Sequence, residues 1–139
     1  MRRLIYGLLA VAMLAAVGCE KEVPYEDQYY VLYFCATVVN ESGEPIQGIL
    51  AYPEGGEFVG RTGYSNYQGV VEGRAYLTPR SRWVVVFEDV DAEANGGEYR
   101  TITEDITDMV VKPSKPDDNG YTGSCIVNIG KITLNLQTM

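Results

Sequence analysis

A cysteine at position 19 is the residue of this chain whose setting most clearly predicts chemistry. It follows two basic residues, Arg2 and Arg3, an uncharged apolar run, and the small residues Ala16-Val17-Gly18. A basic start, an apolar middle and a small-residue cleavage site are typical of a secretory signal peptide. Because Ala16-Val17-Gly18-Cys19 also matches a lipobox, residues 1–18 are predicted to be removed and the Cys19 thiol to carry lipid.

Two other interpretations of this segment are open. An ordinary signal peptide cut nearby would leave Cys19 as a free thiol. A transmembrane anchor needs about 20 apolar residues, and the run from Leu4 to Gly18 is shorter. We expect a lipid-anchored protein of the cell envelope, at the periplasmic or surface-exposed face of the outer membrane. Residues 19–28 would form the lipidated cysteine and its tether.

The predicted mature chain keeps two further cysteines, Cys35 and Cys125. An even pair in a secreted protein favours a disulfide, because compartments outside the cytoplasm are oxidising. A Cys35–Cys125 bridge would join the first predicted strand to the last and contribute about 2–4 kcal/mol to stability. The alternative is two buried free thiols, since a bridge requires the two Cα atoms to lie close together.

An acidic loop over residues 89–97 supplies the candidate metal ligands Asp89, Asp91, Glu93 and Asn95. These residues alternate, so their oxygen atoms would share one side of an extended chain. Calcium takes about six to eight oxygen ligands of these kinds, which makes the loop a candidate calcium site. It is not an EF-hand, because the required glycine is not at the sixth position. The alternatives are a solvated turn and a contact with a partner.

Aromatic residues offer a second candidate site. The chain has eleven tyrosines, and a tyrosine ring presents a flat apolar face together with a hydroxyl group, which suits sugars and protein interfaces. The candidate ligand contacts are Tyr64, Tyr67 and Tyr76. The alternative is that these rings fill the core and cross-strand pairs.

Composition excludes several classes of function. The chain has no histidine, which removes the usual general base and the commonest transition-metal ligand. The net charge is −8, and it falls to −10 when Arg2 and Arg3 are removed. An acidic body argues against nucleic acid as a partner. The sequence therefore predicts a protein that is not an enzyme and that has no cofactor, apart from the calcium alternative.

The elements that position these residues are predicted to be β-strands. Aromatic and β-branched runs alternate with turn clusters rich in Gly, Pro, Asn and Asp. The predicted strands cover residues 30–39, 46–52, 57–62, 70–76, 82–88, 107–112 and 124–137. About seven short strands predict an all-β fold, a small antiparallel β-sandwich that forms one domain over residues 29–139.

Two turn segments resemble a known fold. Residues 37–49 contain Asn40-Glu41-Ser42-Gly43-Glu44-Pro45-Ile46-Gln47-Gly48. This resembles the "D/N-x-x-G-x-P-I/L-x-G" turn of carboxypeptidase-regulatory-like, transthyretin-like sandwiches. Residues 64–71 are similar to their "T-D-x-x-G-x-F" turn, with Asn66 in place of Asp and an aliphatic residue in place of Phe. This resemblance implies the fold alone.

A third segment resembles a lipoprotein family. Residues 84–99 are similar to the "V-x-D-V-D-G-x-x-N-G-x-F/Y" stretch of the radical SAM-associated lipoproteins of Bacteroidales, with Ala92 where that family often has Gly. The resemblance implies a radical SAM enzyme as a partner or modifier, with Cys35 and Cys125 as candidate targets.

The expected function is that of a non-catalytic binding or structural accessory module, held at the membrane by its lipid. One alternative is a calcium-dependent or glycan-binding surface module, and another is a substrate of a radical SAM enzyme.

Overall fold

The computed structural model describes residues 22–55, 57–58, 63–91, 94 and 97–137 of the chain. Position 19 and the predicted signal peptide lie outside these residues. The described chain forms seven strands, which are β1 (Tyr29–Val39), β2 (Ile49–Pro53), β3 (Glu57–Phe58), β4 (Val70–Leu77), β5 (Val84–Asp89), β6 (Ile102–Asp105) and β7 (Tyr121–Thr133). Two short 3₁₀ helices, η1 (Tyr25–Asp27) and η2 (Thr107–Met109), complete it.

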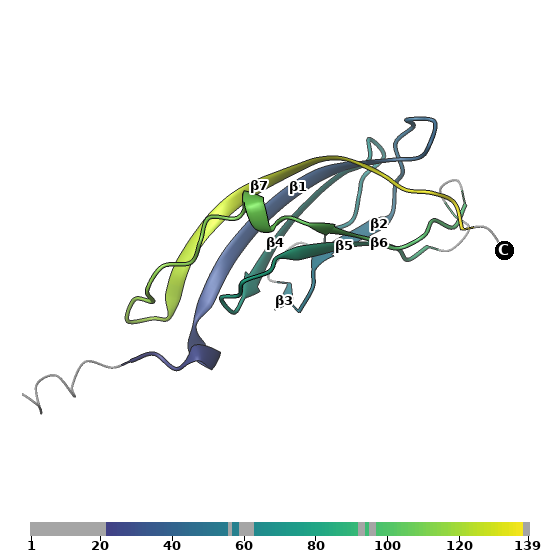
Figure 1. Ribbon diagram of the computed structural model, residues 1–139. Helices are drawn as coiled ribbons and strands as arrows, with labels where there is room; N and C mark the ends of the chain where they lie inside the picture. The colour runs from purple at the N-terminus through teal and green to yellow at the C-terminus, as the bar shows by residue number, and fades with distance from the viewer. Residues whose placement is uncertain (1–21, 56, 59–62, 92–93, 95–96, 138–139) are drawn as a thin grey trace, which may run out of the picture.

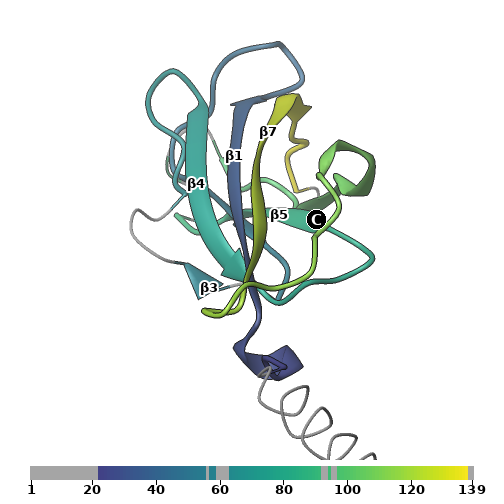
Figure 2. The same ribbon diagram turned by 90° about the vertical axis from the view of Figure 1, so that its left-hand side faces the viewer.

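The strands form two sheets that face each other (Figures 1 and 2). The larger sheet has the order β3-β4-β1-β7, and the smaller has the order β2-β5-β6. Their inner faces bury one core, in which Leu32 and Phe34 of β1 meet Val85 and Phe87 of β5. The predicted all-β sandwich is therefore confirmed.

One strand pair differs from the predicted antiparallel arrangement. The first and last strands, β1 and β7, lie side by side and run parallel, with Phe34 paired to Val127. The other pairs between named strands are antiparallel. The parallel pair forms because β7 returns after a long connection through the second sheet rather than through a hairpin.

Three turns of the domain share one construction. Each has the pattern Asn/Asp-x-x-Gly, with its glycine in the left-handed region: residues 40–43, 66–69 and 117–120. In the first, Asn40 Oδ1 accepts the backbone N–H groups of Ser42 and Glu44. Asn66 and Asp117 accept the equivalent pairs in the other two. A short side chain that satisfies two backbone donors, followed by a glycine, fixes each reversal.

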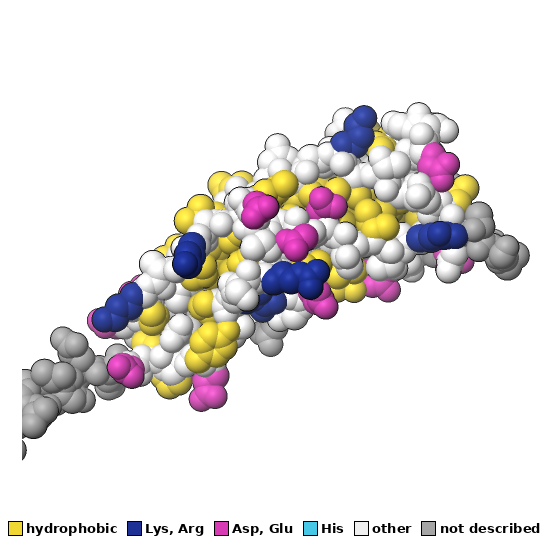
Figure 3. All heavy atoms as spheres, in the orientation of Figure 1, with side chains coloured by type: hydrophobic (Ala, Val, Ile, Leu, Met, Phe, Trp, Pro, Cys, Tyr) yellow, Lys and Arg dark blue, Asp and Glu magenta, His cyan; other side chains and the backbone are white. Residues whose placement is uncertain are grey.

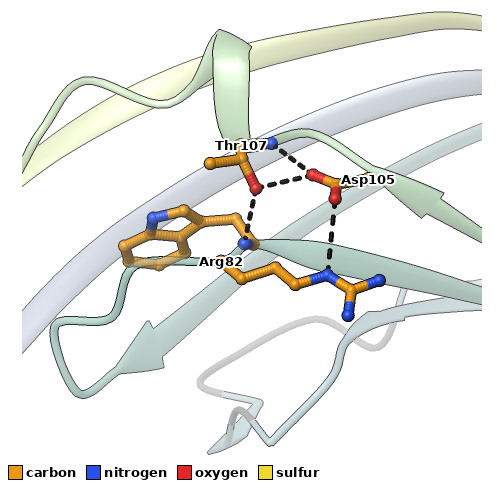
Figure 4. A network of polar contacts seen from close by, with 4 residues as sticks. Arg82, Asp105 and Thr107 are labelled. Atoms are coloured by element: carbon orange, nitrogen blue, oxygen red, sulfur yellow. Dashed lines mark hydrogen bonds and ion pairs between the residues drawn. The ribbon is translucent and has the colours of Figure 1, made fainter.

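The prediction of a strand over residues 107–112 is wrong. The chain instead ends β6 at Asp105 and turns through η2. Asp105 Oδ1 accepts both the backbone N–H and the hydroxyl of Thr107, and Thr107 Oγ1 accepts the N–H of Trp83 (Figure 4). These side-chain bonds compete with a ladder and close a turn.

Other strand ends also shifted. The second strand begins at Ile49 rather than at residue 46, because Gly48 has φ of 85°. The third covers Glu57–Phe58, and residues 59–62 of its predicted range lie outside the described residues. The last strand covers Tyr121–Thr133 rather than 124–137.

The Asp105 turn is expected to make the free energy of unfolding depend on pH in the acid range. The bonds from Thr107, and then the Arg82 guanidinium 3.4 Å away, lower the pKa of the Asp105 carboxyl. A carboxyl with a lowered folded pKa stabilises the protein above its unfolded pKa of about 3.9, and this contribution is lost as the pH falls below that value. We expect Asp105→Asn to remove part of the acid destabilisation seen in urea unfolding at falling pH. If Asp108→Asn on η2 has the same effect, this explanation is wrong.

Candidate functional site

The outer face of the four-stranded sheet is the candidate site. Inward residues of β1, such as Leu32 and Phe34, are buried, whereas Tyr33 points outward and is 40% exposed. Across the neighbouring strands, Tyr33 pairs with Arg74 of β4 and Ile126 of β7, and Ile126 is 80% exposed. The smaller sheet covers only the opposite face (Figure 2). The outer face therefore presents apolar side chains directly to the surroundings.

Three tyrosines form a cluster on this face, one from each of three adjacent strands. The ring of Tyr29 on β1 stacks on Tyr76 of β4, with centroids 5.6 Å apart and planes at 29°. Tyr121 of β7 lies on the other side of Tyr29, also at 5.6 Å. The Arg74 guanidinium lies 6.0 Å from the centroid of the Tyr76 ring. The cluster combines flat apolar surface with hydroxyl groups and one cation.

The predicted aromatic contacts are not brought together. Tyr76 belongs to the tyrosine cluster, and it is 38% exposed. Tyr67 is 74% exposed in the 66–69 turn, at the opposite end of β4 from Tyr76. Tyr64 forms an isolated bridge with Leu50 beside the smaller sheet. The other two members of the cluster are Tyr29 and Tyr121 rather than Tyr64 and Tyr67. The strand register brings these rings together, and the spacing in the sequence does not show it.

The predicted disulfide is wrong, because Cys35 and Cys125 are free thiols. The register places Cys125 beside Leu32, three residues before Cys35, which is about 10 Å along the strand. Cys35 also points to the outer face, with its Sγ 3.9 Å from the carbonyl of Val127, whereas Cys125 packs against the core. The side chains therefore lie on opposite faces of the sheet.

Cys125 instead contacts a buried tyrosine. Tyr30 is fully buried, lies 5.0 Å from the Trp83 ring and donates its hydroxyl to the carbonyl of Val111 at 2.7 Å. Burial, and then the hydrogen bond with Cys125, raise the pKa of the Tyr30 hydroxyl well above its usual range. This group therefore fastens the segment after η2 to the core as a neutral hydroxyl.

Asp89, the first carboxylate of the acidic loop, has a structural role. Asp89 Oδ1 accepts the N–H of Asp91 at 3.1 Å, and Oδ2 accepts the N–H of Tyr99 at 2.9 Å, so this carboxylate holds both ends of the loop. Burial, and then the hydrogen bond with the Asp91 side chain, raise the pKa of Asp89, against the two backbone N–H bonds, which lower it. Glu93 and Asn95 lie outside the described residues. Among the residues that are described, no three acidic or cysteine side chains gather as a metal site.

We expect Asp89→Ala to lower the free energy of unfolding by about 1–3 kcal/mol, because two backbone N–H groups lose their acceptor. The measurement is thermal and urea unfolding with added calcium and with a chelator. The decrease in the free energy of unfolding is expected to be the same with calcium and with the chelator, since it comes from the lost hydrogen bonds. A calcium-dependent rise in the wild-type melting temperature that Asp89→Ala removes would instead establish the predicted calcium site.

Comparison with family models and with curated proteins gives no match. Among solved structures, phospholipase PlaB from Legionella pneumophila is similar to 78% of this chain at 11% identity, with a TM-score of 0.42. The match spans 25% of the phospholipase chain, and a similarity this low carries no argument about activity. Over the described ranges, no helix has the length and apolar character needed to cross a membrane.

Proposed function

We propose that this protein is a non-catalytic binding module of the bacterial cell envelope, anchored by lipid on Cys19. In this proposal, it contacts a partner protein through the outer face of its larger sheet. The observation that carries the proposal is the exposed apolar surface of that face, formed by Tyr33, Tyr76 and Ile126. Exposed hydrophobic groups that gather on one face mark interaction sites.

The lipid anchor and the accessory role are supported by the sequence. The lipobox before Cys19 and the resemblance to radical SAM-associated lipoproteins both favour an envelope protein, and the resemblance alone favours a link to a radical SAM enzyme. A membrane tether raises the local concentration of the module near membrane partners.

Charged side chains of both signs are interspersed with exposed hydrophobic ones over the side seen in Figure 3.

Site-specific photo-crosslinking tests the proposed contact. A benzophenone amino acid in place of Tyr76 is expected to capture a discrete partner in native cells. The matched control is the same replacement at Tyr67, which is more exposed but lies off the face. Adducts of one mass from position 76 and none from position 67 are the expected result. Equal capture from both positions, or none from position 76, would reject the outer face as the contact.

A glycan is the second candidate ligand, and the tyrosine cluster is the observation that favours it. The stacked rings of Tyr29 and Tyr76 could pack against a sugar ring, while the hydroxyl groups bind its edge. A glycan array, probed with and without calcium, tests this. Binding that Tyr29→Ala abolishes and Tyr64→Ala preserves would support the glycan candidate.

A further inference from the structure

The four sheet edges of the described structure differ in their protection. Strand β3 is two residues long, and β6 is four residues long with acidic residues at its end. Strand β2 is covered by the segment before β4, where Ala51 and Ile49 exchange backbone bonds with Gly63 and Ser65. Short length, charge and cover are the usual means of blocking an edge. Strand β7, with 13 residues, is the exception.

The middle of β7 combines several features of an open edge. Residues 124–129, Ser-Cys-Ile-Val-Asn-Ile, carry no charge and no proline. Register shifts against β1 flank them, near Gly123 and Gly130, which both have positive φ. Of the β7 residues, the 114–117 segment bonds to Tyr121 and Thr122 only, so it protects the start of the strand. In the described chain, residues 124–128 pair with β1 alone, and Ile129 falls at the second register shift.

We propose that β7 pairs with the β7 strand of a second copy of this chain, antiparallel and about a two-fold axis at Ile126. Paired residues must point to the same face, so only a pairing of even-numbered with even-numbered positions keeps Ser124, Ile126 and Asn128 together on the outer face. The axis at Ile126 centres the pairing on the uncharged stretch. It then sets Ile126 against its own copy and Ser124 against Asn128.

Two properties of the chain favour a second copy as the occupant. The most exposed hydrophobic residue described, Ile126, packs beside an identical side chain at the axis, and both stay on the outer face. The same pairing brings Lys131 of one copy near the 117–120 turn of the other, which carries Asp117 and Asp118. Charge is therefore absent at the centre and opposite at both ends, although each copy carries a net charge of −8. Isologous contacts of this kind are the commonest in homo-oligomers.

Cysteine crosslinking of the full chain tests the register. In a background with Cys35→Ala and Cys125→Ala, Ile126→Cys is expected to form a covalent dimer under mild oxidation, because the two Cβ atoms lie about 4.5–5.5 Å apart. The matched control is Asn128→Cys, which faces Ser124 of the other copy rather than itself. Cys19 is the same in both variants. Equal dimer yields from the two variants, or none from Ile126→Cys, would overturn the proposed pairing.

Sedimentation of the purified full chain over a range of concentrations tests the association without crosslinks. Ile126→Lys places two like charges at the axis and is expected to raise the dimer dissociation constant at least about tenfold. Lys131→Glu should weaken the dimer less, and more at low salt. A wild-type chain that stays monomeric throughout, or an Ile126→Lys variant that dimerises as wild type does, would refute the proposal. A circular dichroism melt confirms that each variant is folded.

Discussion

Replacing Gly73 with valine is expected to lower the free energy of unfolding by about 1–3 kcal/mol, the range typical of overpacked cores. Gly73 of β4 pairs with Phe34 of β1, whose side chain points into the core. The Phe34 ring lies over the glycine, so that a Cβ atom added to Gly73 would overlap the ring. Phe34 is 2% exposed, so its ring can move away only by displacing other residues of the close-packed core. Urea unfolding measures the loss, and Glu72→Val on the exposed face is the control.

A double-mutant cycle isolates this contact. Gly73→Ala should be less harmful when Phe34 is replaced with leucine, because the smaller side chain leaves space for the added methyl group. The expected coupling is about 0.5–3 kcal/mol, as for residues in direct contact. Additive effects of the two substitutions would show that the ring and the glycine do not constrain each other. The effect of Gly73→Ala would then reflect only the different strand propensities of glycine and alanine.

The fold was predictable where local signals agree. The valine run at residues 84–86 predicted a buried strand, and β5 lies in the centre of its sheet. Asn40 and Asn66 predicted turns, and both close them with their side chains. The strand predicted over residues 107–112 failed because Thr107 and Asp105 bond to each other and to the backbone. Such competing local bonds are not visible in a hydrophobic pattern.

The candidate site was less predictable, since it depends on which strands are neighbours. Tyr29 and Tyr121 are 92 residues apart in the sequence, and only the parallel pairing of β1 and β7 brings their rings together. The same register separates Cys35 from Cys125, although a pair of cysteines in an oxidising compartment favours a bridge. The sequence predicted which types of side chain form the site. Which particular residues form it depends on the order and register of the strands.

Replacing Cys19 with serine is expected to abolish the lipidated form completely. A thiol at this position is the predicted attachment point, and serine cannot form the thioether. Intact mass spectrometry of protein from native membranes is the measurement. The wild-type protein should have the mass of residues 19–139 plus acyl chains, and the variant should lack the acyl mass. Cys125→Ser, which removes a thiol from the folded domain, should keep it.

The membrane location itself requires a second variant, because an uncleaved apolar segment over residues 4–18 could hold Cys19→Ser at the membrane. Exchanging residues 1–18 for an ordinary cleavable signal peptide, with serine at position 19, removes both the lipid and the apolar segment. Each buried methylene of an acyl chain contributes about 0.8 kcal/mol, and one chain binds only marginally. Without any chain, the acidic body should move almost entirely into the soluble fraction. A body that still sediments with the membrane would show that the folded domain, and not the lipid on Cys19, is the main anchor.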